Sequence, residues 1–243
     1  MKIIHEYNII RLREGVEFVM NILEESIKKG FFEGISSIQE IPEDFKDSFS
    51  KVMTCLDYVP MHIKILDLGC GSTGNTIEHK EYNKKYEPWL CRALYSIRAS
   101  SLASCNYEPE KTQIIGVDLG DLSKEKFFHK ELNLLEKDIL INNFEKGSFD
   151  LINASMLFNS PELERILTGK MIKDACKNTS LKLKEVLLPQ IKTLLKPEGI
   201  FLYQGGGKEL FSDEPEYISK FRNSEECMER FRPQERHYWG GQY

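Results

Sequence analysis

The stretch that most constrains the fold of this chain is 63–76, where a short apolar run leads directly into a glycine-rich segment. Ile63 to Leu66 is a run of strand type, and Asp67 closes it. The glycines that follow are Gly69, Gly71 and Gly74. They predict a tight loop, because glycine accepts positive φ and lets a bulky ligand approach the backbone. A strand followed by such a loop can hold a nucleotide-like ligand at the carboxyl end of a parallel sheet.

The acidic residue before the loop narrows the class of ligand. The glycine spacing is shared with dinucleotide-binding loops and is a weak signal by itself. Asp67 places a carboxylate at the mouth of the loop, where it can accept hydrogen bonds from an ammonium group, directly or through water. A pyrophosphate would bring a like charge against this carboxylate. The combination favours a ligand with an amino-acid end, such as S-adenosylmethionine.

The segment Asp67-Leu-Gly69-Cys-Gly71 resembles the first motif of class I S-adenosylmethionine-dependent methyltransferases. Further segments resemble later motifs of that family, and they occur in the family's order. They are IIGVD at 114–118, DI at 138–139, SFDLIN at 148–153 and LLKPEGIFLY at 194–203. The resemblance covers 63–203, and several motifs in register are a much stronger signal than one.

The resemblance implies an α/β fold, a Rossmann-like three-layer sandwich with a mostly parallel central sheet. Residues 1–60 would be an N-terminal helical cap or a packing layer on the sheet, and 61–243 the methyltransferase domain. Polar insertions interrupt that domain near 77–87 and 100–111. The family adds a C-terminal antiparallel hairpin, but the sequence offers no two convincing strands for it, so we expect this antiparallel edge to be incomplete.

Apolar periodicity and turn residues place the elements of the fold. Strands are predicted at 113–118, 132–137, 148–153 and 200–203, with a turn at 196–199. Helices are predicted at 6–29, from near Pro42, and at 88–97, 123–131, 162–177, 181–195 and 214–230. The first of these helices should end near Gly30, and Pro189 should lie inside the helix before the last strand.

The resemblance also implies which residues bind the cofactor. The loop residues Asp67, Gly69, Cys70 and Gly71 would hold its amino-acid end, with Cys70 a small spacer and not a nucleophile. The acid at the end of the second strand would bond the ribose diol. That acid is Asp118, with Leu119 beside it and Asp121 as a weaker candidate. Asp138 and Ile139 would hold the adenine ring, with Asn133 the alternative if the third strand is misplaced. Asn153 would lie near the transferred methyl group.

The implied activity is methyl transfer from S-adenosylmethionine to a small-molecule acceptor, with S-adenosylhomocysteine as product. The stretch 153–160 lacks the acidic-or-amide, Pro, Pro, aromatic pattern of amine and amide methyltransferases, and it offers no histidine as a general base. No catalytic residue is therefore assigned. The alternatives are a nicotinamide-dependent oxidoreductase and a non-catalytic S-adenosylmethionine-binding module that serves a partner protein.

Composition limits the kinds of binding partner and the cellular compartment that we expect for this protein. The formal net charge of −5 argues against a nucleic-acid partner, whose binding depends on clustered Lys and Arg. No apolar run approaches the ~20 residues that cross a bilayer. No C-x-x-C pair is present among the 6 cysteines, so a zinc site is not expected. Without a secretory signal, we expect a cytoplasmic protein with free thiols. The oligomeric state does not follow from the sequence.

Overall fold

The computed structural model describes a central sheet and helices on both of its faces. The described residues are 20–21, 23–30, 35–41, 46, 49, 52, 63–72, 87–99, 113–155, 157–160, 177–204, 210 and 221–223. The predictions for 6–19, for the helix start near Pro42, for Gly74 and most of the two polar insertions, for the helix at 162–176 and for the tail after 223 lie outside these residues.

The described sheet has six strands in the order β3-β2-β1-β4-β5-β6. The strands are β1 (Lys64–Leu68), β2 (Gln113–Asp118), β3 (Phe128–Glu131), β4 (Phe149–Ser155), β5 (Leu195–Gln204) and β6 (Phe221–Asn223). Each pairing between neighbours in this order is parallel. The α/β fold with a mostly parallel sheet is therefore confirmed, and β2 has the predicted bounds.

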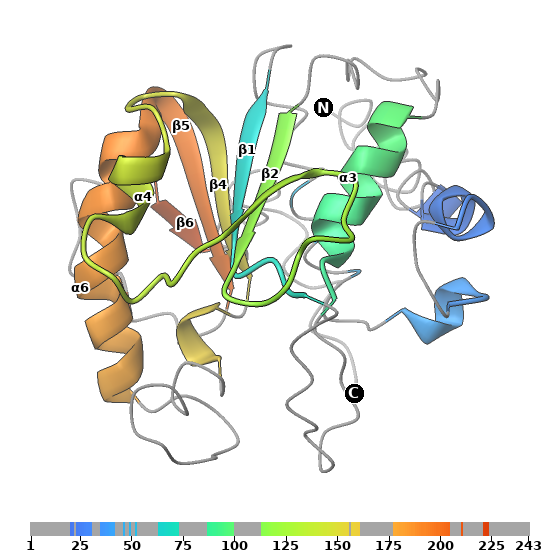
Figure 1. Cartoon of the computed structure of the whole chain (residues 1–243), viewed down its shortest axis with the longest axis horizontal. Helices are drawn as coiled ribbons and strands as arrows, with labels where there is room; N and C mark the ends of the chain where they lie inside the picture. The colour runs from blue at the N-terminus through green and yellow to red at the C-terminus, as the bar shows by residue number, and fades with distance from the viewer. Residues whose placement is uncertain are drawn as a thin grey trace, which may run out of the picture.

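The central strands are buried on both faces, which explains why they read as nearly continuous apolar runs. Successive side chains of a strand point to opposite faces. Ile65 accordingly lies in the core on the side of α3 (Trp89–Ala99), whereas Leu66 and Leu68 lie in the core on the other side. Figure 1 shows α3 on one side of the sheet and both α4 (Ile139–Asn143) and α6 (Lys177–Leu194) on the other.

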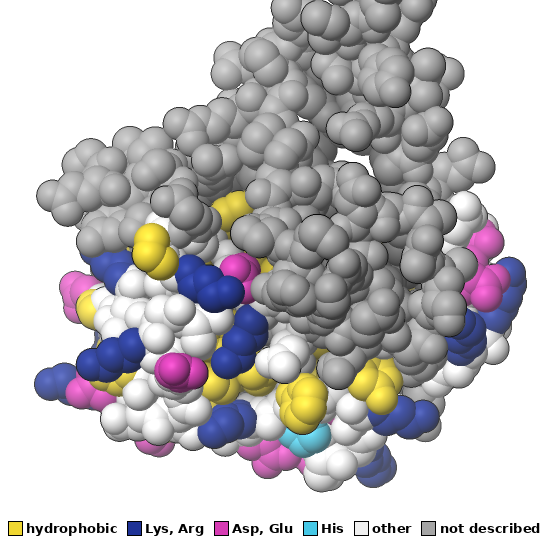
Figure 2. All heavy atoms as spheres, turned by 90° about the horizontal axis from the view of Figure 1, so that it is seen from above, with side chains coloured by type: hydrophobic (Ala, Val, Ile, Leu, Met, Phe, Trp, Pro, Cys, Tyr) yellow, Lys and Arg dark blue, Asp and Glu magenta, His cyan; other side chains and the backbone are white. Residues whose placement is uncertain are grey.

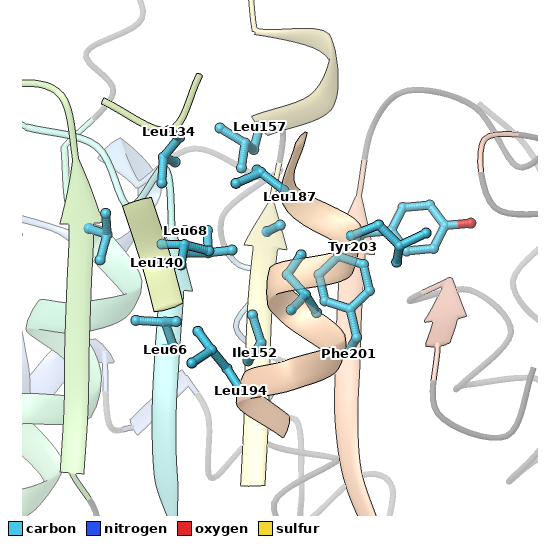
Figure 3. Packing of buried hydrophobic residues seen from close by; sticks show 14 of the residues in the cluster. Leu66, Leu68, Leu134, Leu140, Ile152, Leu157, Leu187, Leu194, Phe201 and Tyr203 are labelled. Carbon is cyan, nitrogen blue, oxygen red and sulfur yellow. The ribbon is translucent and has the colours of Figure 1, made fainter. Parts of the chain in front are cut away.

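The core on the α6 side follows the helical periodicity that the sequence predicts. Leu183, Leu187, Ile191 and Leu194 recur at helical spacing and are fully buried. Figure 3 shows leucines of α6 lying against side chains of β1, β4 and β5. Each fully buried leucine contributes about 2 kcal/mol to folding. Pro189 lies inside α6, as predicted.

The described N-terminal residues pack on the α3 side of the sheet. Residues 23–28 are helical, and Gly30 ends this turn with a φ of +71° and an N–H that donates to the Ile27 carbonyl at 2.8 Å. Leu23, Phe49 and Val52 belong to the same hydrophobic cluster as Ile65 and α3. They therefore form part of a packing layer on this face. Among the described residues, no helix is both long and apolar enough to span a membrane.

The third strand and the element before it differ from the prediction. We expected a helix at 123–131 and a strand at 132–137, but the strand is β3 at Phe128–Glu131, and the next regular element is α4. The sequence of β3 is polar and its residues are largely exposed, so it carries no hydrophobic alternation. Its extended conformation comes from parallel pairing with β2, from Ile115 opposite Phe128 to Asp118 opposite Glu131. Tertiary pairing thus outweighed local propensity here.

The C-terminal part of the sheet also differs from the prediction. Within the predicted helix 214–230, Phe221–Asn223 form the edge strand β6, which pairs parallel with β5 and not antiparallel. β5 begins at Leu195, so the predicted turn at 196–199 lies within the bounds of that strand. The register with β4 shifts between Phe149 and Leu151, and this irregularity accommodates the turn-forming sequence.

Candidate functional site

The candidate site lies where the direction of strand addition reverses. The sheet order runs outward from the adjacent strands β1 and β4, to β3 on one side and to β6 on the other. In open parallel sheets, ligands bind at the carboxyl ends of the strands beside such a point. The candidate site is therefore formed by the residues at the ends of β1, β2 and β4 and in the loops that follow them.

The loop after β1 needs glycine for conformation and for space. Gly69 and Gly71 have φ values of +67° and +89°, in the left-handed region that side chains disfavour. A Cβ atom on Gly69 would lie 2.8 Å from Cδ1 of Leu157, which belongs to the 3-10 turn η3 (Leu157–Asn159) after β4. The loop therefore packs closely against the chain that leaves β4.

Backbone hydrogen bonds join this loop to β2. The N–H groups of Gly69 and Cys70 both donate to the Val117 carbonyl, at 2.8 and 3.1 Å. The Gly71 N–H donates to Oδ2 of Asp118 at 2.9 Å. Consequently, three successive N–H groups of the loop already have acceptors within the protein.

Asp67 lies inside β1 and is buried, with 3% of its surface exposed. Its Oδ1 accepts a hydrogen bond from Nδ2 of Asn153 at 2.8 Å, and its Oδ2 accepts one from the Cys91 thiol at 3.4 Å. Burial raises the pKa of Asp67 to about 6, although the bonds from Asn153 and Cys91 oppose this increase. Asp67, which the sequence places at the mouth of the loop, therefore lies within the last part of the strand, and each of its oxygens already accepts a hydrogen bond.

The thiols beneath the loop are free and buried. Cys70 and Cys91 form no disulfide, and a Cβ on Gly116 would lie 2.9 and 3.0 Å from their sulfur atoms. Burial raises the pKa of Cys70 to about 11 and that of Cys91 well above its ordinary value. Cys70 is therefore a poor nucleophile, as a spacer should be. Among the described residues, no group of three or more His, Cys, Asp or Glu side chains is arranged to hold a metal ion.

The end of β2 presents an acid and an apolar side chain together. Asp118 accepts the Gly71 N–H on Oδ2 and the Gly120 N–H on Oδ1, the latter at 2.9 Å. Leu119, next to it, is 45% exposed, although it is a large apolar residue. The Ser123 side chain and the Ser123 N–H, the latter at 2.8 Å, instead lower the pKa of Asp121, which is an exposed turn residue. The structure therefore brings Asp118 to the loop and leaves Leu119 exposed next to it in the chain, whereas Asp121 bonds within its own turn.

The observed position of β3 changes which of the residues predicted to bind adenine lies at the end of a strand. Asn133 lies just after the end of β3, where its Oδ1 accepts the Leu135 N–H at 3.1 Å. Asp138, at φ 60°, and Ile139 instead lie at the start of α4, and the next residue donates its N–H to Gln190 of α6 at 2.7 Å. The premise that Asp138 and Ile139 end a strand is therefore wrong, and Asn133 takes that place.

Several residues of this region were missed by the sequence analysis. Ser72 is 7% exposed, and its hydroxyl is the only buried side-chain polar atom without a hydrogen-bond partner among the described residues. Its position directly after Gly71 could have suggested it. Cys91 and Leu157 could not have been found in this way, because their contacts depend on how α3 and η3 pack.

Among the described residues on the side that Figure 2 shows, apolar side chains lie between interspersed basic and acidic ones. No protein-family model matches this sequence, and no curated protein matches it.

Proposed function

We propose that this protein binds S-adenosylmethionine at the carboxyl ends of β1, β2 and β4 and transfers its methyl group to a small molecule. The observation that carries the proposal is the contact between Asp67 and Asn153, which joins β1 to β4 at the reversal of the strand order. This order is that of doubly wound, Rossmann-like nucleotide-binding sheets, which supports the finer fold assignment.

The positions of the side chains support an order for the parts of the ligand along the sheet. Asp118 at the end of β2 is suited to a ribose diol, since it places both oxygens of a carboxylate beside the glycine loop at the carboxyl end of the sheet. The exposed Leu119 offers an apolar face for adenine, with Asn133 beyond it after β3. The amino-acid end would then lie over β1 and β4, above the loop and Asn153.

The hydroxyl of Ser72 has no hydrogen-bond partner among the described residues, so a ligand that fits the loop should offer it one. A buried hydroxyl without a partner destabilises the protein by about 1–3 kcal/mol. A ligand with a carboxylate and an ammonium group offers both an acceptor and a donor for it. Because both Asp67 oxygens already have partners, an ammonium group would add a bond to Asp67 directly or through water.

The chemistry requires little of the protein beyond binding and alignment. S-adenosylmethionine supplies an activated methyl group on its sulfonium. The side chains named above would orient this group toward the acceptor, and the packed loop and Leu157 would exclude water. No general base is assigned, and the acceptor class rests on the acidic net charge and the missing amide-type motif.

The nicotinamide alternative is weakened by the hydrogen bonds of the loop. A pyrophosphate binds to free backbone N–H groups in such loops. Here those of Gly69, Cys70 and Gly71 are donated to Val117 and Asp118. The carboxylate of Asp67 also lies just before the loop that would receive the phosphates. The non-catalytic module differs from the proposal only in turnover, so a methylation assay separates these two.

Calorimetric titration with S-adenosylhomocysteine, with NAD as the matched control, tests the proposal. Binding of S-adenosylhomocysteine alone is expected. Binding of NAD alone would replace the proposal with the oxidoreductase alternative, and binding of neither would overturn it. A screen of small acceptors with radiolabelled S-adenosylmethionine then tests turnover.

A further inference from the structure

A buried ion triad joins the first turn of α3 to the loop after β2. The guanidinium of Arg92 donates from Nε and Nη2 to the two carboxylate oxygens of Glu125, at 2.9 and 2.6 Å. Its Nη1 donates to Glu87, just before α3, at 2.7 Å. The three side chains are 8%, 7% and 6% exposed, in the order Arg92, Glu125, Glu87.

This triad fixes a segment that the site depends on. The loop 119–127 begins beside Asp118 and carries the exposed Leu119. Farther along, the fully buried Leu122 donates its N–H to the Glu131 side chain at 2.9 Å. Between Leu122 and β3, Glu125 holds the loop through its two bonds to Arg92.

The same turn of α3 also reaches the other half of the site, because Cys91 donates its thiol to Asp67. Two successive residues of one helix therefore contact the residues below the glycine loop and the loop after β2. We propose that Arg92 is a positioning residue, which through Glu125 holds the loop 119–127 so that Asp118 and Leu119 receive the ribose and base of the ligand. This inference rests on the proposed function of the site.

The chemistry of the triad agrees with a positioning role. A planar guanidinium that bonds both oxygens of one carboxylate fixes orientation as well as distance, which a lysine cannot do. Burial lowers the pKa of Arg92, but Glu125 and Glu87 raise it more, so the guanidinium remains charged. A buried ion pair is weak evidence for stability alone, since its desolvation offsets much of the attraction.

The test uses Arg92→Lys, which keeps the charge and removes the two-pronged contact. Hydrogen–deuterium exchange of the free protein should become faster in 119–127 and stay unchanged in 195–204. The control is Lys196→Met, which breaks the ion pair of Lys196 with Asp150 on β4. This control should leave exchange in 119–127 as in the wild type.

The second readout compares S-adenosylhomocysteine with its 2′-deoxy analogue. In the wild type, loss of one hydrogen bond to a carboxylate should weaken binding about tenfold. In Arg92→Lys, the ratio of the two affinities should shrink, so that the 2′-deoxy analogue binds only about twofold more weakly than S-adenosylhomocysteine, because Asp118 is no longer held in place. General destabilisation would weaken both ligands equally and leave the ratio unchanged.

The outcomes separate this inference from the proposed function. Faster exchange in 119–127 with a reduced ratio supports the positioning role. Unchanged exchange, or faster exchange with an unchanged ratio, overturns it. If the wild type binds neither ligand, the proposed function fails, and the exchange data alone decide whether Arg92 fixes the loop. Glu125→Gln, which keeps the shape of the acceptor, replaces Arg92→Lys if that variant does not fold.

Discussion

Asp67 and Asn153 face each other across β1 and β4, with the Asn153 amide donating to the Asp67 carboxylate at 2.8 Å. They are 86 positions apart in the sequence and meet where the strand order reverses. The contact buries an acid under the glycine loop and holds it with a neutral amide. An acid held in this way becomes sensitive to pH in a range that experiments can reach.

The first prediction concerns the pH dependence of stability. The folded-state pKa of Asp67 is about 6, above the ordinary value of 3.8, so the folded state binds the proton more tightly than the unfolded state. Asp67 therefore destabilises the fold as pH rises from about 4 to about 6, by about 3 kcal/mol in total. Asp67→Asn removes this dependence. Urea unfolding should show that the free energy of unfolding of Asp67→Asn increases relative to that of the wild type as pH rises across this range.

A matched control for that experiment is Asp121→Asn, an exposed acid whose pKa is lowered. This control should change the pH profile little and in the opposite sense. If the difference between Asp67→Asn and the wild type were the same at pH 4 and pH 7, Asp67 would not have the raised pKa.

The second prediction concerns ligand binding by the same residue. Asp67→Asn keeps an oxygen for the Asn153 amide but removes the negative charge that would attract an ammonium group. The affinity for S-adenosylhomocysteine should fall at least tenfold at pH 7.5, a loss of ~1.4 kcal/mol or more in calorimetry. The affinity for 5′-methylthioadenosine, which lacks the amino-acid end, should stay unchanged. Equal losses for both ligands would contradict the role of Asp67.

The central strands were predictable because of the way they are buried. β1, β2 and β4 are covered on both faces or nearly so, and each reads as a mainly apolar run with a polar side chain at or next to its carboxyl end. β3 and β6 were not predictable, because pairing with a neighbour makes them strands. Their own residues show no period of two.

The site was predictable only where its residues adjoin a motif. Asp67 is the second-last residue of β1 and Asp118 is the last residue of β2, so their approach follows from parallel pairing. Gly69 and Gly71 lie in the loop that follows β1. The placement of Asp138 was wrong because it depended on the bounds of β3. The contacts of Cys91 and Arg92 depend on how α3 is rotated and how it packs, which local sequence does not specify.

The third prediction is that Ser72→Ala changes stability and binding in opposite directions. The substitution removes a buried hydroxyl that has no hydrogen-bond partner among the described residues, so the free protein should be stabilised by about 1 kcal/mol. The affinity for S-adenosylhomocysteine should fall about three- to tenfold, as expected for one lost hydrogen bond. Thermal unfolding and calorimetry measure the two effects. Lower stability with unchanged affinity would show that the hydroxyl serves the fold and not the ligand.

The fourth prediction separates conformation from space in the glycine loop. Gly69→Ala combines a φ of +67° with a Cβ contact of 2.8 Å to Leu157. Gly147→Ala is the control, because its φ is +60° but nothing lies within 4 Å of the added atom. The control should cost about 1 kcal/mol of unfolding free energy, and Gly69→Ala about 1–3 kcal/mol more. If urea unfolding showed equal losses of unfolding free energy for the two variants, the Leu157 side chain would move aside without an energetic penalty.

The fifth prediction decides between the two candidates for the adenine ring. Asn133 is the second residue after β3, at the end of the sheet where Asp118 and Leu119 lie, whereas Asp138 lies at the start of α4. Asn133→Ala should weaken S-adenosylhomocysteine about tenfold, the effect of one hydrogen bond together with a loosened turn at Leu135. Asp138→Ala should leave the affinity within about twofold of the wild type, because a group remote from the base contributes little to binding.

Calorimetry with the inosine analogue of the ligand, whose base lacks the amino group, provides the further check. The wild type should prefer the adenine ligand, and Asn133→Ala should lose this preference. If Asp138→Ala lost it instead, the start of α4 would have to reach the ligand, and the assignment based on β3 would be wrong.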